Sequence, residues 1–154
     1  MPKHLRAFAA VFPILLRQGA TGRQVLLHRR QNTGYMDGLW DIAGSGHVDE
    51  GETATQAATR ECAEEIGVAV RADDLAFAHL SHRVGVRGVR TYFDVYFLAS
   101  AFDGEPTVME PEKCSELRWF DLDQLPEDMI DVRKTALRHC LAGSFYGEAF
   151  NPHP

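Results

Sequence analysis

The sequence predicts a single domain of mixed α/β (α+β) class, and three observations support this. The chain has 154 residues, which is enough for one domain with a real core and short for two. Stretches rich in β-forming residues lie on both sides of one amphipathic helical pattern, and a second helical pattern follows near the end. Such an order indicates a mixed sheet packed against helices. We expect the domain to span residues 1–154, with about 1–3 and 148–154 as frayed ends.

The first two strands are expected to form a hairpin. Residues 5–17 form an apolar run in which Pro13 indicates an edge strand or a bulge. Residues 18–22 read as a turn, and residues 24–30 as the returning strand. Residues 31–39 then have the glycine and asparagine content of a loop.

The first helix is expected from about Thr53 to Gly67. Thr53 and Gln56 fit a capping box at its start, and Gly67 stands where a glycine would end it. Ala58, Cys62 and Ile66 form its apolar stripe. The other expected elements are a short extended piece at 40–48, strands at 75–83, 89–101 and 116–122, and a closing helix at 131–141.

Composition and charge narrow the function classes. The net charge of −6 argues against binding to nucleic acid polymers or to an anionic membrane. A small phosphate ester remains open, because a metal ion can bridge it to an acidic site. Three cysteines without CxxC spacing favour reduced thiols and a cytoplasmic location. We find no leader pattern and no apolar run of spanning length, and a homodimer is left open.

Three glutamates suggest a metal site. Glu61, Glu64 and Glu65 stand at i, i+3 and i+4, so they project from one side of the helix. Like charges at this spacing repel and weaken an isolated helix. A compensating cation would explain the cluster, and oxygen ligands favour Mg²⁺ or Mn²⁺. The alternative is a solvated acidic helix face.

The surrounding residues carry a resemblance that favours the metal site. Gly46, Glu52, Arg60, Glu61, Glu64, Glu65 and Gly67 match the pattern Gly-x5-Glu-x7-Arg-Glu-hydrophobic-x-Glu-Glu-x-Gly-hydrophobic. The chain thereby resembles the Nudix hydrolase superfamily, and in particular its MutT-type members. The segment 119–126 near the end also resembles the family, so the likeness extends over most of the chain.

The resemblance implies an α/β/α sandwich with a mixed sheet and a Mg²⁺-dependent attack of water on a diphosphate linkage, with Mn²⁺ as a substitute. By position, Glu61, Glu64 and Glu65 match the family's metal ligands, and one of them or a neighbouring glutamate would act as general base. Glu52 and Arg60 match a supporting pair. The backbone carbonyl of Ser45 matches a further ligand, although the loop 43–46 departs from the family's usual Pro-Gly-Gly and is one residue longer.

Several weaker candidates complete the site. Arg30 stands where the resemblance suggests an arginine that contacts substrate, and Arg29 precedes it; the alternative for both is a solvated strand end. Arg83 is a third candidate for phosphate. A last metal ligand commonly comes from a late loop, and Glu112 is our candidate, with Glu110 and Glu116 as rivals and an ordinary surface acid as the alternative.

The identity of the substrate is the property that the sequence determines least. The family's subgroup markers for ADP-ribose, dinucleoside polyphosphates, NADH and coenzyme A are absent downstream of the motif. This leaves a (d)NTP or an oxidised purine (d)NTP, cleaved to the monophosphate and diphosphate. The alternative is a nucleotide-binding sensor without turnover. Such a protein usually lacks one of the motif acids, and all are present here.

Overall fold

The structure is a computed structural model that describes residues 3–152. Its strands are β1 (Phe8–Gln18), β2 (Arg23–Arg30), β3 (Trp40–Ile42), β4 (Gly46–His47), β5 (Leu75–Gly85), β6 (Tyr92–Ala99), β7 (Cys114–Asp121) and β8 (Tyr146–Asn151). Its helices are α1 (Ala54–Ile66), the short 3₁₀ helix η1 (Ala72–Asp74) and α2 (Asp131–Leu141).

The strands form one mixed sheet. The hydrogen-bonded order is β3-β2-β1-β6-β5-β8, with β4 paired to β1 and β7 paired to β2. β1 runs parallel to β6, and β5 runs parallel to β8. The remaining pairs are antiparallel, including the predicted hairpin of β1 and β2. The expectation of a mixed sheet is therefore confirmed.

Pro13 does not mark an edge strand, because β1 is central. On the side away from β6, β1 pairs with β4 at Ala10 and Val11 and with β2 from Leu16 onward. Pro13 lies between these two pairings. A proline cannot donate to a ladder, and on this side of β1 it stands where neither β4 nor β2 is paired.

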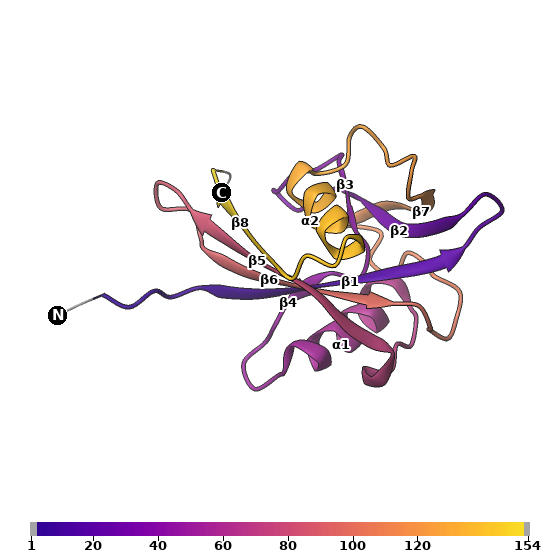
Figure 1. The fold of residues 1–154 in the computed structure, drawn as a ribbon, viewed down its shortest axis with the longest axis horizontal. Helices are drawn as coiled ribbons and strands as arrows, with labels where there is room; N and C mark the ends of the chain where they lie inside the picture. The colour runs from indigo at the N-terminus through magenta and orange to yellow at the C-terminus, as the bar shows by residue number, and fades with distance from the viewer. Residues whose placement is uncertain (1–2, 153–154) are drawn as a thin grey trace.

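The two long helices cover opposite faces of the sheet, as Figure 1 shows with α2 above β1 and α1 below it. Alternating side chains of β1 point to the two faces of the sheet. Val11 packs with Ala57 and Ala58 of α1, whereas Phe12 belongs to the cluster that contains Ala136 and Leu137 of α2. This α/β/α arrangement agrees with the expected sandwich.

The predicted boundaries of α1 are confirmed. The Thr53 hydroxyl accepts from the Gln56 backbone N–H at 3.2 Å, and the Gln56 side chain accepts from the Thr53 N–H at 2.9 Å. Gly67 ends the helix with φ of 68°, in the left-handed region. The buried residues are Ala57, Ala58, Cys62 and Ile66. The acidic side chains therefore project to one side of the packed stripe.

The expected frayed end is wrong for residues 148–151. These residues belong to β8, which pairs with β5 from Leu80–Tyr146 to Gly85–Asn151. Backbone hydrogen bonds to a neighbouring strand hold this segment, and Phe150 remains exposed, so its apolar pattern does not reveal it. Residues 3–7 have no regular structure. Residues 1–2 and 153–154 lie outside the described part of the chain.

Within residues 3–152, neither helix combines the length and the apolar character required to cross a membrane.

Candidate functional site

A cavity of about 900 Å³ lies beside the predicted glutamates. The cavity is lined by residues from β1, β2, β4, α1, the β5–β6 hairpin and α2. The lining includes Arg30, Ser45, Glu65, Arg83, Glu110 and Arg133. Its size is in the range of sites for small organic ligands. Four of the residues predicted from sequence, Arg30, Ser45, Glu65 and Arg83, therefore meet around one space.

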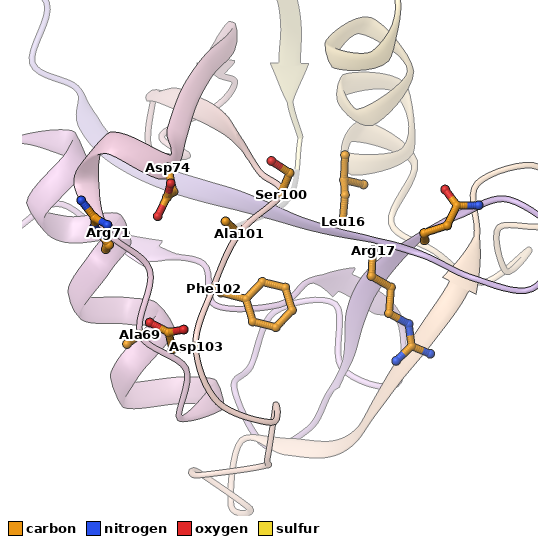
Figure 2. A pocket seen from close by; sticks show the side chains of 10 residues that line it. Leu16, Arg17, Ala69, Arg71, Asp74, Ser100, Ala101, Phe102 and Asp103 are labelled. Atoms are coloured by element: carbon orange, nitrogen blue, oxygen red, sulfur yellow. The ribbon is translucent and has the colours of Figure 1, made fainter.

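A second hollow lies elsewhere and contains none of the predicted site residues. Figure 2 shows it between Leu16 and Arg17 of β1 and the segments around Arg71 and Phe102. Because no predicted side chain reaches it, we take the first cavity as the candidate site.

Arg60 ties the loop before α1 to the acidic face of the helix. Its Nε and Nη2 donate to the two oxygens of Glu52 at 2.6 and 3.0 Å. Its Nη1 donates to Glu61 at 2.8 Å and to Glu64 at 3.2 Å, and Nη2 also reaches the His47 carbonyl at 3.0 Å. The fork geometry of a guanidinium allows one side chain to hold all of these groups.

The glutamates differ in their surroundings. The Glu64 side chain is 54% exposed, whereas that of Glu61 is 12% exposed. Burial raises the pKa of Glu61, and the contact with Arg60 offsets this only in part. Burial, followed by the charges of Glu61 and Glu110, raises the pKa of Glu65 to about 8. The surroundings of Glu61 and Glu65 therefore disfavour the ionised form of both side chains.

Glu65 also has an oxygen without a partner. Its Oε2 is buried and accepts no hydrogen bond. The nearest basic nitrogen, His28 Nδ1, is 4.0 Å away. Burial lowers the pKa of His28, with Arg30 assisting against the opposing effect of Asp41, so the ring is neutral near pH 7 and does not compensate the carboxylate.

Gly46 leaves room for the Glu61 carboxylate. A Cβ atom at this position would lie 2.1 Å from the carboxyl carbon of Glu61. Gly46 and the buried Ser45 also line the cavity. The motif glycine thus allows a carboxylate to lie directly against the β4 backbone, which explains why a side chain is unsuitable there.

These groups fit a divalent cation, although in their present positions no three His, Cys, Asp or Glu side chains among residues 3–152 converge as a metal site. Three observations support the fit. Glu65 has an orphaned buried oxygen, its pKa is raised by burial and by neighbouring acids, and all the donors are oxygens. Hard oxygen donors suit Mg²⁺ or Mn²⁺, and a bound cation would favour the ionised form of Glu65 that its surroundings otherwise disfavour.

Among the late-loop acids it is Glu110, and not our candidate Glu112, that lines the cavity, which favours Glu110 as the proposed ligand. Glu112 is exposed and its side chain does not line the cavity. Glu110 does line it, and its charge raises the pKa values of both Glu61 and Glu65. Glu116 lies on β7 and is not part of the lining either. The loop's turn decides which acid faces inward, and spacing alone does not reveal this.

The three arginine candidates have separate environments. Arg29 does not line the cavity; it pairs with Asp128 at 3.1 Å on the surface. Arg30 does line it, and its guanidinium donates to the Tyr35 carbonyl at 2.7 Å and to Asp41 at 3.1 Å. Arg83 is 5% exposed and donates to Asp94 at 2.8 and 3.1 Å.

The buried polar network on the α2 side of the cavity was not predicted from the sequence. Asp41, Asp94 and Arg133 are each at most 3% exposed. Arg133 comes from α2, Asp94 from β6 and Asp41 from β3, so the chain positions are far apart. The one available signal was a charged residue at an apolar position of the closing helix, between Ile130 and Leu137.

Comparison with known families and proteins agrees with this geometry. Residues 6–140 match the family model described as NUDIX domain. A Bacillus subtilis protein named "Putative 8-oxo-dGTP diphosphatase" is 32% identical over 124 residues, which cover 80% of this chain and 72% of that protein. A Danio rerio protein named oxidized purine nucleoside triphosphate hydrolase is 36% identical over 111 residues, which cover 67% and 62%.

A solved structure has the same fold over almost its whole length. The MutT NUDIX hydrolase from Burkholderia pseudomallei superposes with a TM-score of 0.77 at 27% identity. The match covers 88% of this chain and 98% of that protein.

Proposed function

Since this chain belongs to the Nudix family as a MutT-like hydrolase, we propose that it cleaves a (d)NTP or an oxidised purine (d)NTP to the monophosphate and diphosphate with Mg²⁺. The names of the Bacillus subtilis and Danio rerio relatives support this substrate class. The family by itself supports hydrolysis of a small nucleotide derivative, and the proposal extends it to a particular group of substrates.

One observation carries the proposal. The buried and unpartnered oxygen of Glu65 lies in a cavity that Glu110, Ser45 and Arg83 also line. A buried carboxylate without a partner is costly. Such an arrangement is expected where a bound cation completes the site. The same cavity offers guanidinium groups for an anionic substrate.

The roles of the residues follow from their contacts. The cation would be held by Glu61, Glu65, the Ser45 carbonyl and Glu110. Glu64 would lie at the exposed edge of this site. When bound, the cation supplies neutralisation of the diphosphate and a lowered pKa for an attacking water. One of the carboxylates takes the proton from that water. Arg60 and Glu52 keep the helix and loop in register, and Arg30 and Arg83 face the substrate from the other walls.

The experiment is a panel of nucleotides incubated with Mg²⁺, with identification of the products. We expect a nucleoside triphosphate to yield monophosphate and diphosphate. The variant Glu61→Gln removes a proposed ligand and should lower kcat by about a hundredfold, the scale for loss of a group that stabilises developing charge. Glu50→Gln changes an exposed acid in the neighbouring loop and serves as the matched control. Equal rates for Glu61→Gln and the control would contradict the assigned role.

A further inference from the structure

The chain that leaves β2 stays attached to the loop that carries Glu110. The ladder between β2 and β7 ends at Arg30 and Cys114. Beyond it, the Gln31 backbone N–H donates to the Lys113 carbonyl at 2.9 Å. The connection between the two segments therefore continues past the strands and into the loop before β7.

The side chains of Gln31 and Asn32 add two contacts to the same loop. Gln31 Nε2 donates to the Pro111 carbonyl at 2.5 Å, and Asn32 Nδ2 donates to the Glu112 carbonyl at 3.2 Å. Pro111 and Glu112 are the two residues directly after Glu110. We call Gln31 and Asn32 the clamp, because together they hold the main chain on one side of Glu110.

The chain on the other side of Glu110 is attached to α1. The Met109 backbone N–H donates to the Glu65 carbonyl at 3.2 Å, and that of Thr107 donates to the Ile66 carbonyl at 2.9 Å. Carbonyls in the last turn of a helix have no partner within the helix, so the loop satisfies two of them. Glu110 is thus fixed next to Glu65, whose carboxylate is itself a proposed ligand.

Between these two attachments the chain makes a turn that begins at Glu110. The backbone N–H groups of Lys113 and Cys114 both donate to the Glu110 carbonyl at 3.0 Å. An ion pair of Lys113 Nζ with Glu110 Oε2 at 3.4 Å is partly exposed, and such pairs contribute little. The direction of the Glu110 side chain therefore depends mainly on how the turn is anchored, and the clamp anchors it.

The backbone of Asn32 agrees with a fixed role. Its φ of 53° lies in the left-handed region, which asparagine tolerates better than most other residues. Asn32 is exposed and lines the cavity, so burial of its side chain does not hold this conformation. Residues with such a backbone persist where surrounding contacts fix them, and the contact of Asn32 with the Glu112 carbonyl is of this kind.

We propose that Gln31 and Asn32 are positioning residues of the metal site, which hold Glu110 where its carboxylate reaches the cation. This inference rests on the proposed function, in which Glu110 is a ligand. Without the clamp, the loop would also adopt positions that turn Glu110 away. The apparent affinity for Mg²⁺ falls with the fraction of molecules that are able to bind it. The value of kcat at saturating Mg²⁺ is kept, because the bound cation draws Glu110 back.

The test measures Mg²⁺ binding to the nucleotide-free protein by calorimetry. Gln31→Met keeps the length of the side chain and removes its donor. Asn32→Gly removes the donor and keeps a backbone that readily adopts positive φ. We expect each variant to bind Mg²⁺ about two- to tenfold more weakly, the range for loss of one hydrogen bond between neutral groups.

A matched control makes the same change elsewhere. Gln124→Met alters an exposed glutamine far along the chain from the clamp, and it should bind Mg²⁺ as the native protein does. Binding by Gln31→Met and Asn32→Gly that equals that of this control would overturn the inference.

A double-mutant cycle tests whether the clamp acts through Glu110. In a Glu110→Gln background, Asn32→Gly should have no further effect on the Mg²⁺ concentration that gives half-maximal hydrolysis. An equal effect in both backgrounds would show a general loosening of the fold and would overturn the inference. A fall in kcat at saturating Mg²⁺ with unchanged Mg²⁺ dependence would also overturn it, because it would place Asn32 against the substrate.

Failure of the proposed function gives a different result. If the native protein does not bind Mg²⁺, the proposed function is wrong and the inference with it. If the native protein binds Mg²⁺ and the two clamp variants bind it equally well, only the inference is wrong.

Discussion

Arg60 donates a hydrogen bond to each carboxylate oxygen of Glu52, from Nε to Oε1 at 2.6 Å and from Nη2 to Oε2 at 3.0 Å. Arg60 follows Glu52 by eight positions, and their contact joins the loop before α1 to the middle of the helix. The Asp49 backbone N–H adds a further hydrogen bond to Glu52 at 2.9 Å. The position of the acidic face relative to β4 therefore depends on this pair.

The first prediction concerns acid stability. Hydrogen bonds from Arg60 and from the Asp49 backbone lower the pKa of Glu52 to about 2. A carboxyl with a lowered pKa stabilises the fold above its ordinary value of 4.5, and this contribution is lost as the pH falls from 4.5 toward 2. Urea unfolding of the native protein and of Glu52→Gln should therefore differ at pH 6 and converge toward pH 3. Glu50→Gln should show no such convergence, and a constant difference for Glu52→Gln would refute the prediction.

The second prediction concerns Gly46. In Gly46→Ala the new methyl group would collide with the Glu61 carboxylate, which is the end of a flexible side chain. We expect Glu61 to move aside, so that kcat/KM falls at least about tenfold while the melting temperature changes by only a few degrees. Steady-state kinetics and calorimetry on the same preparation test this. A loss of stability as large as the loss of activity would show that the contact is structural.

The third prediction concerns magnesium. A ligand that binds only the folded state raises the melting temperature, by about 2–4 °C per kcal/mol of binding free energy in a domain of this size. We expect Mg²⁺ to raise the melting temperature of the native protein and of Glu50→Gln alike. The rise should be largely lost in Glu65→Gln, because the orphaned carboxylate is replaced by a neutral amide. A full response in Glu65→Gln would remove Glu65 from the set of proposed ligands.

The fourth prediction concerns the buried network. Although burial opposes it, the charges of Arg133 and Arg83 hold the pKa of Asp94 below its ordinary value. Asp94→Asn leaves two buried guanidinium groups without their carboxylate, and we expect a loss of about 3–5 kcal/mol in the free energy of unfolding. Chemical denaturation measures this. Asp123→Asn, at an exposed position, is the matched control. A loss below about 1 kcal/mol would mean that the network is hydrated or rearranges.

The sequence by itself determined the local part of this protein. Contacts between residues no more than four positions apart determine the bounds of α1, its caps at Thr53 and Gly67, and the acidic side of the helix. The spacing of residues in the sequence therefore reveals these features. The bounds of α2 were predicted for the same reason. The motif from Gly46 to Gly67 also identified the family, because its residues lie close together in the chain.

The tertiary structure decided the parts that depend on distant contacts. β8 is held by backbone pairing to β5, which leaves little trace in its side chains. The turn of one loop places Glu110 inward and Glu112 outward. Asp41, Asp94 and Arg133 meet only because the sheet order brings β3, β6 and α2 together. These contacts follow from the packing of whole helices and strands, so no short stretch of sequence predicts them.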